Sequence, residues 1–293
     1  MSDLALPAAA ARHASPALLL LRRLVRRRLV LASLLILLVV VVAALGAPWI
    51  APYAPRKMAI AHRLAPPSMA HWFGTDEFGR DTLSRCIYGA RLSLSVGALV
   101  VLASLGCGTL LGVVSGYVRR LDGLLMRVTD ALMAFPDILL AIALMAALGA
   151  SLTDVVIALG TVYTPRVARV ARGATLVLRE LQFIEAAEAL GASDRRVIAV
   201  HLLPNLLSPL LVQGTFVFAF AILTEAALSF LGAGVPPTDP TWGNMIADAQ
   251  EYMQNAFWLI LAPGLCIVLT VLALQMVGDG LRDALDPRLR RLT

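Results

Sequence analysis

Long runs without any charged residue constrain this chain of 293 residues more than any other feature. Residues 29–48 and 92–118 contain no Asp, Glu, Lys or Arg. A helix rises about 1.5 Å per residue, so each run is long enough to cross about 30 Å of hydrocarbon. Apolar residues make up 59% of the chain and its mean hydropathy is +0.80, values typical of membrane proteins. The sequence therefore predicts an all-α, polytopic membrane protein.

Six transmembrane helices account for the apolar runs. The third is expected to bend or break at Pro136. The fourth helix has the weakest sequence signal, because its charge-free run covers only 11 residues, 155–165. It must continue past Arg166 and Arg169, whose long side chains are expected to reach the membrane interface. The predicted organisation is a cytoplasmic basic tail (1–28), a first transmembrane helix (29–49), an extracytoplasmic segment (50–91), a five-helix core (92–280) with a cytoplasmic loop (174–204), and a cytoplasmic tail (281–293).

The distribution of basic residues predicts the orientation of these helices. With both termini in the cytoplasm, 19 of the 25 Lys and Arg residues lie on the cytoplasmic side and six lie in segment 51–91. This asymmetry follows the positive-inside rule, and it explains the net charge of +6 without a nucleic-acid partner. A cleaved signal peptide is the alternative for the first helix. Its apolar part would usually span about 7–15 residues, fewer than the 20 of run 29–48.

Two sets of residues in the core recur at helical spacings. Gly108, Gly112 and Gly116 share one helical face, where small residues allow another helix to approach closely. We expect tight packing there. Arg166, Arg169 and Arg172 also share a face, which is expected to point toward lipid headgroups or a partner.

The longest polar interruption in the C-terminal half covers residues 185–196 and continues to residue 205. Its Glu, Ala and Leu residues favour a helix as far as Gly191, where the missing Cβ permits a helix end or close contact with a partner. Ser193 and Asp194 are expected to cap a second short helix. Pro204 is expected at the start of the next apolar helix. The segment is predicted to project from the membrane as helix, glycine turn and helix.

This interruption resembles the cytoplasmic coupling loop of ABC importer permeases. It contains Glu-Ala-Ala at 185–187, then Gly191, and Leu-Pro at 203–204. His201 replaces the apolar residue of the general pattern, which is similar to the peptide and nickel branch. Four other strings resemble the second permease subunit of dipeptide, oligopeptide and nickel importers: FGTDEFGRD at 73–81, DALMAFP at 130–136, LSFLGAG with WG within 228–243, and residues 278–288.

The resemblance implies a type I ABC importer permease fold in a bacterial inner membrane. It implies a heterodimer with a homologous permease, two cytoplasmic ATP-binding subunits and an extracytoplasmic substrate-binding protein. Di- or oligopeptides are the implied substrates; glutathione-like compounds and nickel chelates use similar permeases and remain open. The residues assigned to ATPase coupling are Glu185, Ala186, Ala187, Gly191, His201 and Pro204.

The sequence contains no recognisable enzymatic motif. A P-loop needs a lysine after its second glycine, and the single lysine, Lys57, lies in Pro-Arg-Lys-Met. ATP hydrolysis is therefore expected on separate subunits. The four histidines and three cysteines show no metal-ligand spacing, and no Ser-His-Asp set is visible. We expect a transport subunit rather than an enzyme, with no cofactor and no metal.

Glu225 is the one carboxylate within a well-defined apolar run. A charge in lipid is costly, so Glu225 either faces the translocation path or is a neutral or hydrogen-bonded residue near the outer interface. Gln213, Thr215 and Thr224 are further candidates for the path. Two other classes of protein were considered. An ion-coupled transporter should have several ionisable residues in the membrane and paired broken helices, and a non-transporting scaffold would not use the coupling loop. Co-purification of ATPase subunits distinguishes both from an importer.

Overall fold

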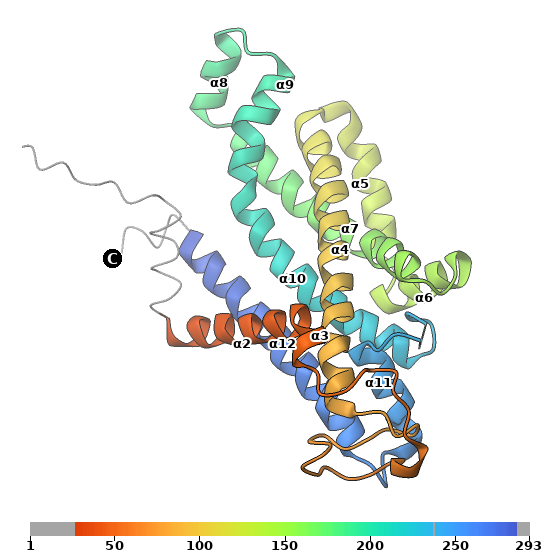
Figure 1. Ribbon diagram of the computed structural model, residues 1–293. Coiled ribbons are helices and arrows are strands. Elements are labelled where there is room, and N and C mark those ends of the chain that lie inside the picture. The colour runs from red at the N-terminus through yellow and green to blue at the C-terminus, as the bar shows by residue number, and fades with distance from the viewer. Residues whose placement is uncertain (1–26, 237, 286–293) are drawn as a thin grey trace, which may run out of the picture.

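The computed structural model describes residues 27–236 and 238–285, and throughout these ranges the regular structure is helical (Figure 1). An isolated bridge between Thr75 and Asp81 is the one strand-like pairing in this part of the chain. The elements are α2 (Arg28–Leu45), α3 (Ala47–Ile50), η1 (Ile60–His62), α4 (Thr82–Tyr117), α5 (Arg119–Met133), α6 (Asp137–Leu148), α7 (Leu152–Arg179), α8 (Gln182–Ala189), α9 (Asp194–Arg196), η2 (Val197–Leu202), α10 (Leu203–Phe230), α11 (Trp242–Ala249), η3 (Gln250–Tyr252) and α12 (Trp258–Leu285). The prediction of an all-α membrane protein is confirmed.

Four helices are long and apolar enough to cross a membrane: α2, α4, the continuous helix Asp194–Phe230, and α12. Helices α5 and α6 make a fifth if they are taken as one span, bent by 94°. The bend lies directly before Asp137, so the predicted break at Pro136 is confirmed. Helix α7 is not among the four because it carries Arg166, Arg169, Arg172 and Arg179. The count of six spans stays a prediction and requires α7 to cross.

The two ends of the bundle differ in what they carry. Segment 51–81 and α11 lie at one end, while α8 and α9 lie at the opposite end (Figure 1). Arg27, just before α2, forms an ion pair with Asp283, near the end of α12. The two ends of the described chain therefore lie on the same side of the molecule. Helix α12 extends to Leu285, into the predicted tail 281–293. The rest of that tail and nearly all of tail 1–28 lie outside the described residues.

The glycine face of α4 packs against α7. Gly108, Gly112 and Gly116 are buried. A Cβ on Gly108 would lie 2.5 Å from Cβ of Val167, and a Cβ on Gly116 would lie 2.8 Å from Cβ of Thr175. The predicted close approach of another helix is confirmed, and the approaching helix belongs to the same chain.

Gly112→Ala is expected to lower the free energy of unfolding by about 1–3 kcal/mol, the usual cost of overpacking. The added Cβ would lie 2.4 Å from the backbone oxygen of Ala168 and 2.5 Å from Cβ of Ala171. Gly106→Ala is the matched control, because a Cβ at this position of the same helix meets nothing within 4 Å. It should leave stability unchanged or raise it, since alanine favours helix. Thermal denaturation of the detergent-solubilised protein measures both, and equal effects would contradict this packing.

The arginine face of α7 pairs with α5 and α6. Arg166 forms an ion pair with Asp137 at 2.5 Å, and Arg169 with Asp130 at 2.7 Å. Arg172 donates two hydrogen bonds of 2.6 Å to Asp122. The position of Arg166 and Arg169 relative to the membrane interface stays a prediction. The bend between α5 and α6 brings three aspartates along α7, and these aspartates are the partners of the arginines.

Candidate functional site

Residues 182–204, which we call the coupling hairpin, project from the end of α7. Ile184, Val197 and Leu202 are each 0% exposed and form a small apolar core of their own. Ile184 lies on α8, whereas the other two lie on η2. These apolar residues fix the two arms of the hairpin against each other, so the polar interruption in the sequence folds as a compact unit.

The turn of the coupling hairpin is centred on Gly191, which has φ +83°. The N–H of Gly191 donates to the carbonyl of Glu188 at 2.9 Å, and that of Ala192 donates to Ala187 at 3.0 Å. A left-handed residue with these two bonds is a common helix ending and favours glycine. A Cβ on Gly191 would meet nothing within 4 Å. The predicted glycine turn is confirmed, and the surface around it is open.

The second arm of the hairpin differs from its prediction in two respects. Ser193 precedes α9, but its side chain accepts no capping hydrogen bond. Asp194 instead accepts a hydrogen bond of 2.9 Å from Tyr117 Oη. Pro204 lies at the start of α10, as predicted, but no break separates α10 from α9 and η2, because Asp194–Phe230 is one continuous helix of 37 residues. The wider π-helical turn η2 directly before Pro204 accommodates the ring and the missing N–H.

A groove of about 620 Å³ opens on the coupling hairpin. Four of the six residues predicted to couple line it: Ala186, Ala187, Gly191 and His201. The other two, Glu185 and Pro204, are exposed on the hairpin but do not line the groove. The sequence analysis missed its other lining residues: Phe183, Leu190, Ala192, Ser193 and Arg196. Leu190 is 90% exposed. Its sequence signal is its position, because a large apolar residue next to a glycine turn in a polar segment indicates an exposed contact surface.

The hairpin is attached to the end of α4. Arg179 Nη1 donates to the carbonyls of Gly116 and Tyr117, at 3.2 and 3.1 Å. Tyr117 in turn donates to Asp194 in the second arm. A displacement of the hairpin would therefore act on α4 as well as on α7 and α10.

The structure does not bring the candidate path residues to one face. Thr224 shares a hydrogen bond of 2.6 Å with Tyr163 on α7. Thr215 packs against α12, where a Cβ on Gly278 would lie 2.3 Å from Thr215 Oγ1. These two threonines lie nine positions apart, which places them on opposite faces of a helix. Gln213 is half-buried.

Glu225 is only 1% exposed. Its Oε1 accepts a hydrogen bond of 2.9 Å from Ser229, and Oε2 is buried without a partner among the described residues. This arrangement within the subunit favours the hydrogen-bonded glutamate of the two alternatives. A role of Glu225 in the translocation path stays a prediction.

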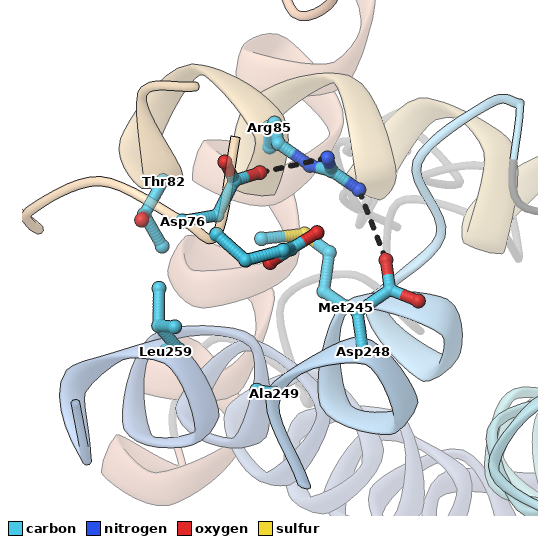
Figure 2. A pocket seen from close by; sticks show the side chains of 8 residues that line it. Asp76, Thr82, Arg85, Met245, Asp248, Ala249 and Leu259 are labelled. Atoms are coloured by element: carbon cyan, nitrogen blue, oxygen red, sulfur yellow. Dashed lines mark hydrogen bonds and ion pairs between the residues drawn. The ribbon is translucent and has the colours of Figure 1, made fainter. Parts of the chain in front are cut away.

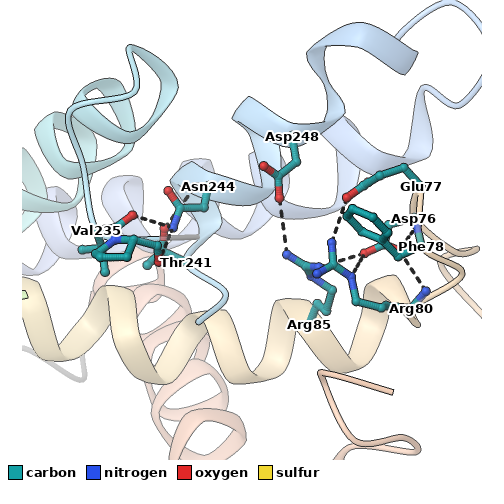
Figure 3. Close-up of polar contacts among 10 residues, drawn as sticks. Asp76, Glu77, Phe78, Arg80, Arg85, Val235, Thr241, Asn244 and Asp248 are labelled. Atoms are coloured by element: carbon teal, nitrogen blue, oxygen red, sulfur yellow. Dashed lines mark hydrogen bonds and ion pairs between the residues drawn. The ribbon is translucent and has the colours of Figure 1, made fainter. Parts of the chain in front are cut away.

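At the other end of the molecule, five charged residues form what we call the outer cluster: Asp76, Glu77, Arg80, Arg85 and Asp248 (Figures 2 and 3). Asp76 is its centre, accepting bonds from Arg80 Nε at 2.5 Å and Arg85 Nη1 at 2.9 Å. Asp76 also accepts from the backbone N–H groups of Phe78 and Arg80. Arg85, 2% exposed, reaches Asp248 on α11 at 3.5 Å. The cluster therefore fastens segment 51–81 to α4 and α11.

Asp248→Asn should change the pH dependence of stability. Burial raises the pKa of the Asp248 carboxyl above its usual value of 3.8, and the nearby Arg80 opposes this shift. A carboxyl with a raised pKa in the folded state loses stability as pH rises from its unfolded pKa through its folded pKa. The variant lacks this loss, so its melting temperature relative to wild type should increase over that window. Glu251→Gln, an exposed neighbour, is the control. A constant difference across the pH range would contradict the prediction.

Comparisons with known proteins agree with this architecture. Residues 108–291 match the family model for the binding-protein-dependent transport system inner membrane component. Residues 15–67 match the model for the N-terminal TM domain of oligopeptide transport permease C. The putative peptide transport system permease protein of Brucella suis biovar 1 is 52% identical over 248 residues, covering 85% of this chain and 84% of that protein. The dipeptide transport system permease protein DppC of Escherichia coli K12 is 45% identical over 255 residues, covering 85% of both.

A solved structure shares the fold. The inward-facing MetNI methionine ABC transporter superposes with a TM-score of 0.56 at 19% identity, covering 71% of this chain and 96% of that chain. The family model and the relatives are those of permeases, which places the chain among transport subunits rather than enzymes. The chain belongs to the family of inner membrane components of binding-protein-dependent transport systems. The predicted resemblance to ABC importer permeases is confirmed. Members of this family reside in the inner membrane and work with other subunits.

Proposed function

We propose that this chain is the second permease subunit of an ATP-driven importer of di- or oligopeptides. It forms the translocation path with a homologous permease, and an extracytoplasmic binding protein delivers the peptide. Two cytoplasmic ATP-binding subunits supply the energy. The names of relatives at 45–52% identity, which are peptide and dipeptide permeases, support this substrate class.

The observation that carries the proposal is the open groove of the coupling hairpin. It combines apolar side chains, including the exposed Phe183 and Leu190, with the basic Arg196 and His201. An exposed apolar surface with a charged margin is typical of a protein interface. The occupant we propose is an ATP-binding subunit. Closure of the two ATP-binding subunits on ATP would move the hairpin, and α10, which is continuous with it, would move too.

Reconstitution of the complex with its partner subunits into proteoliposomes tests the function. Uptake of the dipeptide Ala-Phe should require both ATP and the loaded binding protein. The ATP-binding subunits should also co-purify with the chain. Uptake driven by an ion gradient without ATP would instead favour a secondary transporter, and absence of any uptake would refute the proposal.

Cysteine labelling tests the proposed orientation, with both termini in the cytoplasm. In a background with Cys86, Cys107 and Cys266 replaced, an impermeant maleimide on intact spheroplasts should label Thr238→Cys strongly. It should label Ala192→Cys only after the membrane is opened, because the coupling hairpin lies at the opposite end of the bundle (Figure 1). The reverse pattern would overturn the topology.

A further inference from the structure

A second groove, of about 380 Å³, lies at the end of the molecule that carries segment 51–81. One wall is a face of α4, on which Tyr88, Arg91 and Ser95 follow at helical spacing. Two loops complete the lining: the loop after α3 contributes Arg56, and the loop after α10 contributes Asp239. The groove shares no lining residue with the coupling hairpin or the outer cluster.

Side chains of both charge signs line this groove. Arg56 forms an ion pair with Asp239 at 2.5 Å, but the two side chains are 70% and 57% exposed. Such an exposed pair contributes little to stability, so a charged ligand can replace either partner. Arg91 is exposed and has no carboxylate within ion-pair distance in residues 27–236 and 238–285. The groove therefore offers two guanidinium groups and one carboxylate.

We propose that this groove is a binding subsite for a short peptide with both termini charged, an inference that rests on the proposed import of peptides. Arg91 binds the terminal carboxylate, because a guanidinium presents two parallel donors to a carboxylate. Asp239 exchanges Arg56 for the terminal ammonium group of the peptide. The volume falls within the range of about 300–1,000 Å³ that small-ligand pockets have. Tyr88 and Leu92 provide apolar surface that accepts varied peptide side chains.

Photo-crosslinking tests the subsite on the complete complex in nanodiscs. The probe is alanyl-(4-benzoyl)phenylalanine, with Ala-Phe, its C-terminal amide, and an analogue with hydroxyl in place of the amine as competitors. In wild type the probe should label groove residues. Ala-Phe should compete at least about tenfold better than either analogue, since each analogue lacks one charge.

Variants assign each charge to a residue. Arg91→Gln should abolish the discrimination against the amide, and Asp239→Asn that against the hydroxyl analogue. Arg120→Gln, an exposed arginine on α5 outside the groove, should preserve both. Unchanged discrimination in Arg91→Gln, or labelling confined to other surfaces, would overturn the subsite.

The same complex separates the subsite from the proposed function. ATP-driven uptake of Ala-Phe without labelling of the groove would refute the subsite alone. Charge-selective labelling without uptake would keep the subsite and refute import. Failure of both would remove both proposals.

Discussion

Gly191→Asp is expected to reduce ATP-driven peptide uptake at least about tenfold, while the chain still inserts in the membrane. Aspartate tolerates the left-handed conformation of this residue better than most side chains, and its Cβ meets no atom within 4 Å, so the hairpin should fold. The carboxylate would project into the groove where we propose that an ATP-binding subunit docks. Burying an unpaired charge costs several kcal/mol, and about 1.4 kcal/mol already corresponds to a factor of ten.

Gly191→Asn is the matched control for this variant. It has the same size and the same tolerance of a positive φ, but no charge. Its effect on uptake should be clearly smaller. Peptide uptake, ATP hydrolysis stimulated by the loaded binding protein, and co-purification of the ATP-binding subunits are measured for both. If Gly191→Asp keeps all three near wild type, the hairpin is not the coupling element.

Asp76→Ala should cause the largest loss of stability, about 3–5 kcal/mol, the cost of removing one partner of a buried ion pair. Asp76 is 6% exposed and accepts bonds from Arg80 and Arg85, of which Arg85 is 2% exposed. Without Asp76, both arginines lose their central partner, and the backbone N–H groups of Phe78 and Arg80 lose their acceptor. Segment 51–81 should then separate from α4.

Limited proteolysis of segment 51–81 and thermal denaturation measure this effect. Glu77→Gln is the matched control in the adjacent position, because Glu77 accepts a single bond, from Arg80 Nη2. It should lower stability by much less. Equal protease resistance of Asp76→Ala and wild type would show that the outer cluster does not hold the segment.

Local sequence signals predicted the hairpin and the bend, because each depends on nearby residues. Glycine adopts a positive φ without strain, which permits the turn at Gly191, and the missing N–H of proline favours a break at Pro136. The spacing of Gly108, Gly112 and Gly116 likewise predicted a packed face. Their partner, α7, could not be predicted from spacing, because the contact joins residues far apart in the sequence.

Long-range pairing accounts for the contacts that local patterns did not predict. The aspartate partners of Arg166 and Arg169 could not be predicted, because they lie 29 and 39 positions away on other helices. The candidate path residues were grouped because they occur on one helix. Thr215 and Thr224 nevertheless point to opposite faces and pack against α12 and α7. Composition identifies such residues but not the side of the helix that they occupy.

The unbroken helix Asp194–Phe230 has a mechanical consequence. Its 37 residues make it about 55 Å long, and it begins within the hairpin and ends beside α11. A rigid rod of this length that tilts by about 5° around one end displaces the other end by about 5 Å. Such a rod would transmit a small movement of the hairpin to the residues beside α11 at its other end. A pivot nearer the middle of the helix, where Gly214 packs against Leu105 of α4, would divide this displacement between the two ends.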